Sequence, residues 1–500
     1  MNNTYVGFSC GAHDVSYCVY DEGKVIHHYE LERHNRIKEC HDDIVKVFIN
    51  NINNYKTPSK SFSFKMARNI NQIYPESYNH LKQIIGSDMM FYAHHVIHAA
   101  NAFYSSVFKE AVVISVDGGG EQDDMQSAFG MYYFDSQNNI TKLQTRFDNL
   151  LSFNLGTPWG ATAELLLGRG VGNQSGTLMA MAAFGSFNDE IYNILQEIIN
   201  QRSNAYHLLL KYDKNDVAHT LQKITDEYFE LFLATATQTF KTNNVCFVGG
   251  CSLNSSAIGK LAVKYPNLNF YVPPIPYDAG LALGVCQFYW HKVLNMPRTF
   301  EEASPYLGMS YEIPEEIKSL GKKVNEKEVI DLLQQGKIIS VYSGRSESGR
   351  RALGNRSILA DPTIPNIKDL INAKVKNRQA FRPFAPAILK EDVKNWFIKD
   401  IESPYMSFCI PFLDSKLDIV PAVVHKDNTG RLQTVTESLN PQFYNLLKSW
   451  KDQTGIPIIL NTSFNNKEPI VETPQHALNC FKNTNIDCLY FRDEDILISR

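Results

Sequence analysis

Residues 111–121 read AVVISVDGGGE, in which a run of apolar, mostly β-branched residues leads into three consecutive glycines. The pattern predicts a buried strand over 111–116 and a tight turn over 117–121, with a returning strand over 128–134. Near the start of the chain, YVGFSCGAHDVSYCVY (5–20) repeats the order of strand, glycine turn and strand. Two copies of one strand–turn–strand unit predict a duplicated α/β domain with two related lobes.

A third glycine element follows the two hairpins in chain order. The apolar run 245–248 ends at once in Gly249 and Gly250, and a helical stretch begins after Asn254. Glycines at a strand end let a planar base lie against the backbone, and the amides of a glycine turn form an anion-binding nest. Elements of this kind and order contact adenosine and phosphate in actin- and hexokinase-like ATPases. We expect nucleotide contacts from Gly118, Gly119, Gly249, Gly250 and Asn254. A purely structural role stays open for each hairpin taken alone.

The composition is that of a globular protein with more than one domain. The chain has 500 residues, 44% of them hydrophobic and 20% charged, which is enough apolar surface for a packed core. Its 49 Lys and Arg against 53 Asp and Glu leave a net charge of −4, which excludes a protein that grips nucleic acid through bulk positive charge. A local basic groove is not excluded.

Cysteine usage and hydropathy bear on the compartment. The nine cysteines are scattered without CxxC spacing, so we expect neither a disulfide scaffold nor a cysteine-based zinc site. The sequence shows no signal-peptide pattern, and no apolar stretch approaches the ~18 residues of a membrane span. We therefore expect a cytoplasmic protein that does not associate with a membrane.

The stretch 297–314 has little periodicity and predicts a linker. Before it, an apolar helical run over 281–290 closes the first half. After it, a predicted helix over 327–335 and a strand over 337–342 begin a new α/β unit. We therefore expect one domain over 1–310 and a second over 315–500.

Two histidines four residues apart form a candidate metal site. HHVIHAANAF (94–103) predicts a helix, which places His94 and His98 on one face. Asp117 begins the second glycine turn, and Asp278 stands at a helix entry after three prolines. Two imidazoles with carboxylates suit iron(II), manganese or zinc. A solvated helix face or a capping role would explain the histidine pair equally well.

A stretch rich in glycine and arginine, GRSESGRRALGNRS (344–357), directly follows a predicted buried strand. Glycines expose backbone amides, and arginine binds phosphate or carboxylate through two parallel hydrogen bonds. Further basic residues lie in 372–386. The polar run NTSFN (461–465) is predicted at the end of a strand over 456–460, the edge where open α/β sheets bind ligands. The pattern favours a pocket for a small phosphorylated ligand over nucleic-acid contact or a salt-bridged surface.

These stretches resemble the O-carbamoyltransferase family, which includes the nodulation-factor and antibiotic carbamoyltransferases. The resemblance covers nearly the whole chain. Its most specific parts are GRSESGRRALGNRSILADP (344–362), FRPFAPAIL (381–389), the stretch 425–435 with TGRLQTV, NTSFN (461–465) and DAG (278–280). The first half also resembles the TsaD-type domain of threonylcarbamoyl-adenosine synthesis and part of the hydrogenase maturation carbamoyltransferase. The second half resembles a YrdC-like domain.

The resemblance implies an actin/hexokinase-like, TsaD-like two-lobe domain followed by a YrdC-like α/β domain. It implies ATP and carbamoyl phosphate as substrates, a carbamoyl-adenylate formed in the second domain, and carbamoyl transfer to an acceptor hydroxyl in the first. It also implies an iron(II)-type metal held by His94, His98, Asp117 and Asp278, with Mg(II) accompanying the nucleotide. The acceptor would be a sugar, a natural product or a hydroxymethylated nucleotide or DNA base.

Residue roles follow from the resemblance and from position. His13 and His95 are the candidate bases for the acceptor's hydroxyl proton, and Asp14 lies beside His13 in the first glycine turn. Lys38 lies in the basic run after the first hairpin and is a candidate substrate contact. The arginines of the second half would neutralise the charge of a forming mixed anhydride. The substrate contacts expected there are Arg345, Arg351, Asn355, Arg356, Lys374, Arg378, Arg382, Asn461, Ser463 and Asn465.

Departures from the family pattern concern the acceptor rather than the reaction class. Arg350 stands where the family usually has Pro, and the family's Gly-Lys pair reads Gly176-Thr177 here. The basic run after the first hairpin, 36–42, is longer than usual. Two other functions stay open, a non-catalytic assembly subunit that keeps the fold and a tRNA threonylcarbamoyl transferase. The oligomeric state, including a homodimer, is also open.

Overall fold

The computed structural model describes residues 3–11, 13–66, 68–122, 125–168 and 174–500. The chain forms two compact units. The first contains the described residues up to Ala257 together with Lys264–Leu307, and the second contains Ile258–Val263 and Gly308–Arg500.

Two five-stranded sheets of identical topology form the first unit. The first sheet has the order β3-β2-β1-β4-β5, and the second has the order β10-β9-β6-β7-β8. In each, the central strand, β1 or β6, pairs antiparallel with a two-strand meander on one side and parallel with two further strands on the other. This duplication confirms the predicted actin/hexokinase-like two-lobe fold. The strands are β1 (Thr4–Ser9), β2 (Ser16–Asp21), β3 (Lys24–Glu30), β4 (Lys60–Phe64), β5 (Met90–Tyr92), β6 (Ala111–Gln122), β7 (Met125–Phe134), β8 (Ile140–Leu143), β9 (Asn244–Val248) and β10 (Asn269–Tyr271).

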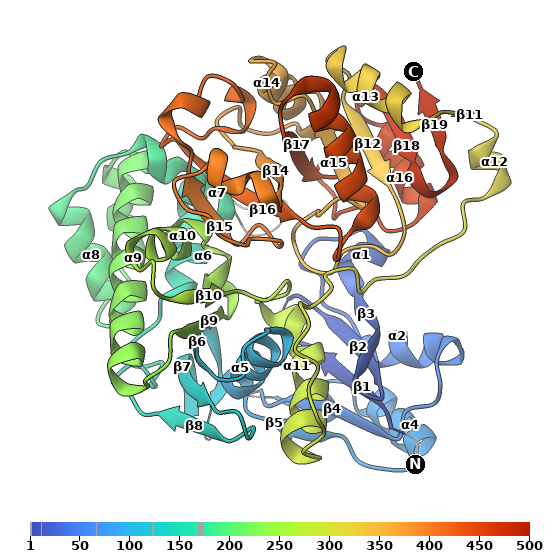
Figure 1. Ribbon diagram of the computed structural model, residues 1–500. Coiled ribbons are helices and arrows are strands. Elements are labelled where there is room, and N and C mark those ends of the chain that lie inside the picture. Colours follow the sequence, from blue (N-terminus) through green and yellow to red (C-terminus); the bar gives the residue numbers. More distant parts are fainter. Residues whose placement is uncertain (1–2, 12, 67, 123–124, 169–173) are drawn as a thin grey trace. The chain divides into compact units, whose positions relative to one another are not determined.

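Two helices, α5 (His94–Ser105) and α11 (Leu281–Gln287), pack against each other between the two sheets (Figure 1). Helix α11 lies on the first sheet so closely that a Cβ on Gly7 would be 2.1 Å from the Ala282 carbonyl oxygen. Helix α5 packs on the second sheet, where Phe103 joins a buried cluster with Val113 and Phe134. The layers therefore follow in the order first sheet, α11, α5 and second sheet. The two helices, with the residues at their N-termini, occupy the inner layers of the unit.

The remaining helices of this unit cover the outer faces and edges of the sheets. They are α1 (Leu31–Asn35), α2 (Ile44–Asn51), α3 (Ile70–Ile73), α4 (Pro75–Ile85), α6 (Gly156–Leu167), α7 (Ser175–Met181), α8 (Asp189–Ile199) and α9 (Lys214–Thr239). Helix α10 (Ser255–Lys264) begins in the first unit, but its residues Ile258–Val263 belong to the second. The long helix α9 buries Phe229 and Phe232 against the second sheet, where Phe229 stacks on Phe247 with ring centroids 5.3 Å apart.

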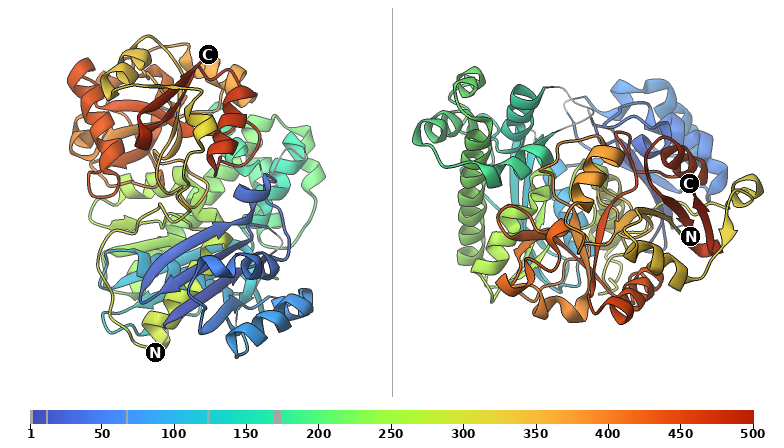
Figure 2. Two further views of the ribbon diagram at one scale, coloured as in Figure 1. Left: turned by 90° about the vertical axis from the view of Figure 1, so that its right-hand side faces the viewer. Right: turned by 90° about the horizontal axis from the view of Figure 1, so that it is seen from above.

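A nine-stranded sheet, ordered β11-β19-β18-β12-β13-β17-β14-β16-β15, forms the second unit. Helices α13 (Glu326–Gln334) and α15 (Pro441–Thr454) pack on one face of it through Leu333, Phe443 and Trp450, and α12 (Glu315–Lys318), α14 (Ile367–Ile371) and α16 (Pro474–Lys482) complete the unit (Figure 2). The strands are β11 (Lys322–Lys323), β12 (Ile339–Tyr342), β13 (Arg356–Ala360), β14 (Ala385–Leu389), β15 (Phe408–Pro411), β16 (Thr429–Val435), β17 (Ile458–Ser463), β18 (Cys488–Phe491) and β19 (Ile496–Ser499).

The structure corrects one predicted turn and one predicted strand end. Strand β6 continues through 117–121, because Gly120 and Glu121 still pair with β7, while the register shifts between Val116 and Gly120. The glycines therefore form an irregularity inside a strand. Residues 123–124 lie outside the described residues. Likewise, 461–463 belong to β17, since Ser463 pairs with Ser357 of β13. No helix among the described residues is long and apolar enough to cross a membrane.

Candidate metal centre and anion site

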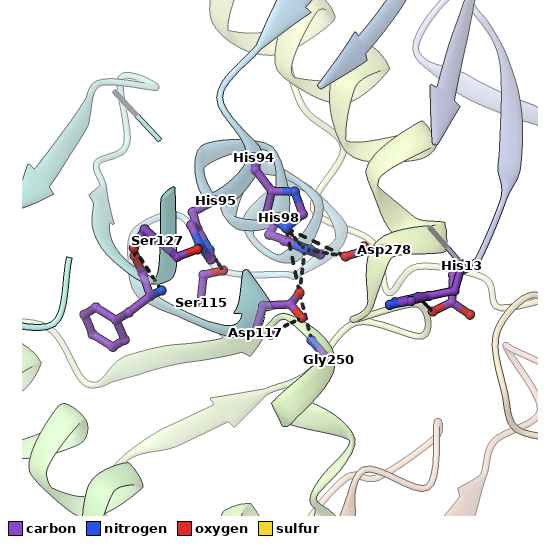
Figure 3. Close-up of polar contacts among 12 residues, drawn as sticks. His13, His94, His95, His98, Ser115, Asp117, Ser127, Gly250 and Asp278 are labelled. Carbon is purple, nitrogen blue, oxygen red and sulfur yellow. Dashed lines mark hydrogen bonds and ion pairs between the residues drawn. The ribbon is translucent and has the colours of Figure 1, made fainter. Parts of the chain in front are cut away.

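Helix α5 presents two buried imidazoles to two aspartates. The Nε2 atoms of His94 and His98 lie 3.1 Å apart. The Asp117 Oδ2 atom is 3.0 Å from His98 Nε2, and the Asp278 Oδ1 atom is 3.3 Å from it (Figure 3). One ligand atom from each of the four residues lies within 4.8 Å of the others. The four predicted metal ligands, from α5, β6 and the entry to α11, thus converge on one point.

The charges in this cluster suit a cation. Burial alone would lower the pKa of His98, but hydrogen bonds to Asp117 and Asp278 outweigh it and raise the pKa to about 9. Burial would raise the pKa of Asp117, yet the two histidines hold it well below its usual range. Two imidazole nitrogens facing two carboxylates form the nitrogen and oxygen donor set that iron(II), manganese and zinc accept. The residues present therefore fit a divalent metal ion.

Backbone amides fix the carboxylate of Asp117. Its Oδ1 accepts from the Gly118 N–H at 2.6 Å, and its Oδ2 accepts from the Gly250 N–H at 3.1 Å. Both glycines were predicted as nucleotide contacts, and their amide hydrogens already have an acceptor within the protein. Gly249 likewise donates to the Pro276 carbonyl, and its φ of 88° places it where a Cβ would be 2.3 Å from the Val116 oxygen.

Asn254 and Gly119 are the two other glycine-region residues of this unit that were predicted to contact nucleotide. The Asn254 side chain accepts from the Ala257 amide, which caps the start of α10, and it exchanges hydrogen bonds with Gln222. Gly119 lies in the irregular part of β6 with a φ of 155°. The amides of Gly118 and Gly250 thus orient Asp117, one of the two acidic residues of the cluster.

We expect Gly120→Ala to abolish metal binding with little loss of fold. A Cβ at Gly120 would lie 2.3 Å from Cγ and Cδ2 of His94, so the imidazole would have to leave its position. Titration of chelator-treated protein with Mn(II) by calorimetry checks this, and a wild-type affinity in Gly120→Ala would contradict the placement of His94. Gly176→Ala is the matched control, because among the described residues no atom lies within 4 Å of the position of that Cβ, and it should bind Mn(II) normally.

The two candidate bases differ sharply. His95 is fully buried, and its Nε2 donates to the Ser127 carbonyl while its Nδ1 accepts from the Ser115 hydroxyl. Burial lowers the pKa of His95 to about 3. Both ring nitrogens of His95 are therefore bonded within the unit, which leaves His13 as the more accessible of the two candidate bases. His95 instead pins α5 to β6 and β7.

His13 keeps the features of a base. Its side chain is 53% exposed, and its Nδ1 lies 2.7 Å from Oδ2 of the buried Asp14. A carboxylate only accepts when ionised, so Nδ1 carries the hydrogen and Nε2 carries the lone pair. A Cβ at Gly11 would be 3.7 Å from Asp278 Oδ2, which places this turn beside the metal cluster (Figure 3). Lys38 lies half-buried in the loop after α1, and its substrate contact stays a prediction.

In the second unit, one buried carboxylate organises the arginine-rich loop. The Glu347 Oε1 atom accepts from the amides of Leu353, Asn355 and Arg356, at 2.6, 2.8 and 3.2 Å. From the sheet side, Asn461 of β17 donates to the Ala352 carbonyl at 3.1 Å. This predicted ligand residue therefore holds the loop that carries Arg351.

We expect Glu347→Ala to lower the stability of this unit by about 3 kcal/mol, because three amides lose their acceptor in a buried site. Glu347→Gln keeps an acceptor oxygen and should lose much less. Urea unfolding followed by tryptophan fluorescence measures both variants against wild type. An unchanged unfolding midpoint in Glu347→Ala would show that the loop does not depend on this carboxylate.

Two residues of this loop are occupied by structural contacts. The fully buried Arg356 begins β13 and donates to the carbonyls of Ser343, Gly344 and Asn355, with its guanidinium 3.6 Å from the centroid of the Tyr342 ring. Backbone oxygens therefore accept the guanidinium hydrogens of this predicted substrate contact within the second unit. Asn355 also turns inward: it donates to the Arg345 carbonyl and accepts from Asn440 and Arg492.

Three arginines, Arg378, Arg382 and Arg431, influence one another electrostatically and have no acidic partner among the described residues. Burial, Arg382 and Arg431 lower the pKa of Arg378 well below its usual value, and burial and Arg431 lower that of Arg382 to about 10. Arg378 donates to the Asn372 side chain at 2.7 Å and lies over the Phe384 ring. Among the described residues, no carboxylate pairs with any of the three, and Arg431 Nε is buried without an acceptor. Like charges held together in this way fit a bound anion.

Sequence reasoning missed Arg431 as a site residue, although it lies in the quoted run TGRLQTV. A charged residue inside a strand whose other residues are mostly buried was the available signal. The same region contains Lys376, whose buried Nζ bonds to the Asn465 side chain at 2.7 Å and to the Ser463 hydroxyl at 3.2 Å. The predicted residues Ser463 and Asn465 therefore surround a lysine, whereas the predicted Lys374 is exposed on the same segment. Arg345 donates to the Gly308 carbonyl, and Arg351 lies half-buried in the loop.

The fold and the two sites together define a class of protein: a two-lobe α/β unit of the actin and hexokinase type with a His₂Asp₂ centre, joined to an α/β unit with an arginine cluster. Residues 12–286 match the family model described as carbamoyltransferase N-terminus, and residues 330–500 match carbamoyltransferase C-terminus. The chain belongs to the carbamoyltransferase family, as its sequence motifs predicted. This confirms the predicted enzyme class.

The similar proteins span bacteria and archaea. An uncharacterised protein of Methanocaldococcus jannaschii is 30% identical over 479 residues, which cover 84% of this chain and 75% of that one. Nodulation protein NolNO of Sinorhizobium fredii is 31% identical over 81% of this chain and 63% of its own length. The 3'-hydroxymethylcephem-O-carbamoyltransferase of Amycolatopsis lactamdurans is 30% identical over 59% of each chain. Among solved structures, full-length HypF in its phosphate- and nucleotide-bound form matches 60% of this chain and 47% of its own, at 13% identity and a TM-score of 0.39.

Proposed function

We propose that this chain is an ATP-dependent O-carbamoyltransferase. Its second unit, resembling a YrdC-like domain over 315–500, would form carbamoyl-adenylate from ATP and carbamoyl phosphate. Its first unit, a TsaD-like domain over 1–310, would transfer the carbamoyl group to an acceptor hydroxyl. The observation that carries the proposal is the cluster of Arg378, Arg382 and Arg431, three guanidinium groups without an acidic partner among the described residues.

The arginine cluster suits the first half-reaction. Carbamoyl phosphate loses inorganic phosphate with the uptake of one water, and the resulting carbamate oxygen attacks the α-phosphorus of ATP, which releases pyrophosphate. Negative charge concentrates on the phosphates during both steps. Guanidinium groups that are already desolvated and fixed stabilise such charge without further reorganisation. The loop held by Glu347 and Asn461 would place Arg351 on the same ligand.

The His₂Asp₂ cluster suits the second half-reaction. His94, His98, Asp117 and Asp278 would hold a divalent ion, which we propose to be iron(II), with Mg(II) accompanying the nucleotide. Such an ion would act as a Lewis acid that polarises the carbamoyl carbonyl, and it would bind phosphate oxygens. His13 would take the acceptor's hydroxyl proton on Nε2, while Asp14 holds its Nδ1 hydrogen. The acceptor oxygen then bonds to the carbamoyl carbon, and AMP leaves.

The acceptor class is the open part of the proposal. The name of the Amycolatopsis relative states a hydroxymethyl group as the acceptor for that protein. For this chain we propose a primary hydroxyl on a sugar, a natural product or a hydroxymethylated nucleotide or DNA base. The exposed His13 next to the cluster is compatible with acceptors that approach from solvent.

An acceptor panel tests this function. Purified protein with Fe(II), Mg(II), ATP and carbamoyl phosphate is incubated with hydroxymethyl nucleosides, sugars and hydroxymethyl cephems, and products are examined by mass spectrometry. We expect an acceptor that gains one carbamoyl group and AMP formed in equal amount. A tRNA arm with threonine distinguishes threonylcarbamoyl transfer. If no arm yields product and carbamoyl phosphate drives no ATP turnover, the chain is a non-catalytic subunit.

A further inference from the structure

Asp278 differs from the other acidic ligand in how its carboxylate is held. Both oxygens of Asp117 accept hydrogen bonds from backbone amides. Among the described residues, the Asp278 carboxylate meets only the two histidines of the cluster, at 3.3 and 3.7 Å. Its orientation must therefore come from the backbone that carries it.

That backbone, 275–280, is tied to three different parts of the unit. Asn101 of α5 donates its Nδ2 hydrogen to the Ile275 carbonyl at 2.8 Å. The Gly249 amide, after β9, donates to the Pro276 carbonyl at 2.7 Å. The first two ties come from α5, which carries the histidines, and from the segment after β9 in the same lobe. The third comes from the opposite sheet.

The third tie ends on the carbonyl next to Asp278. The Ala279 oxygen accepts from Ser16 Oγ of β2 and from His28 Nε2 of β3, both at 2.8 Å. Both donors are buried, and together they occupy both lone pairs of one carbonyl. His28 Nδ1 in turn lies 3.6 Å from Glu30, which lies 3.6 Å from Arg33. A buried polar chain in the first lobe thus reaches the residue adjacent to a metal ligand.

We propose that Ser16 and His28 are positioning residues for the metal centre, which orient Asp278 through the Ala279 carbonyl; this rests on the proposed metal site. Neither side chain touches the ligand atoms. They fix the Ala279–Gly280 peptide, one residue beyond Asp278, against the first sheet. Groups that orient metal ligands in this way change metal affinity by about 10–100-fold when they are removed.

The chemistry of His28 supplies a discriminating pair of variants. A carbonyl oxygen only accepts, so His28 Nε2 carries the hydrogen in this bond. Burial lowers the pKa of His28 to about 4, so the ring is neutral at pH 7 with that single N–H. Glutamine can place an amide N–H near the Nε2 position, whereas methionine fills similar space without a donor. His291→Met is the matched control, because His291 is also buried and also bonds a backbone carbonyl, that of Met296.

The test measures metal affinity and apo stability separately. Chelator-treated wild type, His28→Met, His28→Gln and His291→Met are titrated with Mn(II) by calorimetry, and their melting temperatures are recorded in EDTA. We expect His28→Met to bind Mn(II) about 10–100-fold more weakly. His28→Gln and His291→Met should bind it like wild type, while both methionine variants melt alike in EDTA.

Each other outcome overturns the inference in a recognisable way. Wild-type affinity in His28→Met, or an equal loss in His291→Met, would show that His28 does not act on the centre. A loss in His28→Gln as large as in His28→Met would show that the donor is irrelevant. If His28→Met does not fold, Ser16→Ala carries the test, and unchanged affinity there refutes the proposal. A wild type that binds no Mn(II) or Fe(II) refutes the proposed metal site itself.

Discussion

Replacing His98 with alanine is expected to slow carbamoyl transfer to the acceptor by about a thousandfold. His98 Nε2 lies closer to both carboxylates of the cluster than His94 Nε2 does, at 3.0 Å from Asp117 and 3.3 Å from Asp278. Its loss removes one of four candidate ligands and leaves two acidic side chains facing each other. The measurement is carbamoylated product per unit time at saturating ATP, carbamoyl phosphate and acceptor.

The same variant should still release pyrophosphate from ATP when carbamoyl phosphate is supplied, because the arginine cluster lies in the other unit. His80→Ala is the control, since His80 is an exposed histidine on α4, and it should keep both activities. If His98→Ala makes product at the wild-type rate, the His₂Asp₂ centre has no part in transfer. If it loses pyrophosphate release as well, the two half-reactions are not divided as proposed.

Replacing Arg382 with alanine should have the opposite signature. Pyrophosphate release that depends on carbamoyl phosphate is expected to fall about 100–1000-fold, because a preorganised positive group facing the reacting phosphates is removed. Arg431→Ala should fall by a similar factor, since its Nε hydrogen is buried without an acceptor among the described residues. Arg382→Lys keeps the charge but not the two parallel donors, and should lie between alanine and wild type.

The control for charge loss in this unit is Lys394→Ala, which removes an exposed cation. It should release pyrophosphate at the wild-type rate. Mn(II) binding should be unchanged in all of these variants, because none lies in the unit that contains the four metal ligands. Full pyrophosphate release in both Arg382→Ala and Arg431→Ala would contradict the assignment of the arginine cluster to carbamoyl-adenylate formation.

The duplicated fold was predictable because it is written in local sequence. Both lobes begin with a strand, a short polar segment and a returning strand, and the periodicity of the helix at 94–105 placed His94 and His98 on one face. Chain order alone could not show that β6 continues through its glycines. That course depends on pairing with β7, where Gly120 and Ser127 are partners.

The roles of single side chains were predictable only in part. His95 and His13 are equivalent as letters in the sequence, and tertiary contacts alone separate them: Ser115 and Ser127 enclose the first, while Asp14 orients the exposed second. The sequence does not distinguish Arg356 from the neighbouring arginines. The structure does, because the Arg356 guanidinium donates its hydrogens to backbone carbonyls. Arg431 is far from Arg378 and Arg382 along the chain. Only the fold of the second unit brings it near them, so a local pattern could not connect the three.

The glycines also show how far the sequence alone can predict the role of a residue. Gly118 lies in a turn with the pattern of a phosphate nest, and Gly250 lies at a strand end of the kind that can receive a planar base. In the folded protein their amides hold the Asp117 carboxylate, which no local pattern connects with residue 250. Sequence thus indicated which residues serve a site, while the structure shows which of them orient the others.

The most direct test of the account is pyrophosphate release from ATP before any acceptor is added. The purified chain is incubated with Mg(II) and ATP, with and without carbamoyl phosphate, and pyrophosphate and inorganic phosphate are both quantified. The account predicts pyrophosphate release only with carbamoyl phosphate, with one inorganic phosphate formed for each pyrophosphate. Equal pyrophosphate with and without carbamoyl phosphate, or none although ATP is bound, would contradict the formation of a carbamoyl-adenylate by this protein.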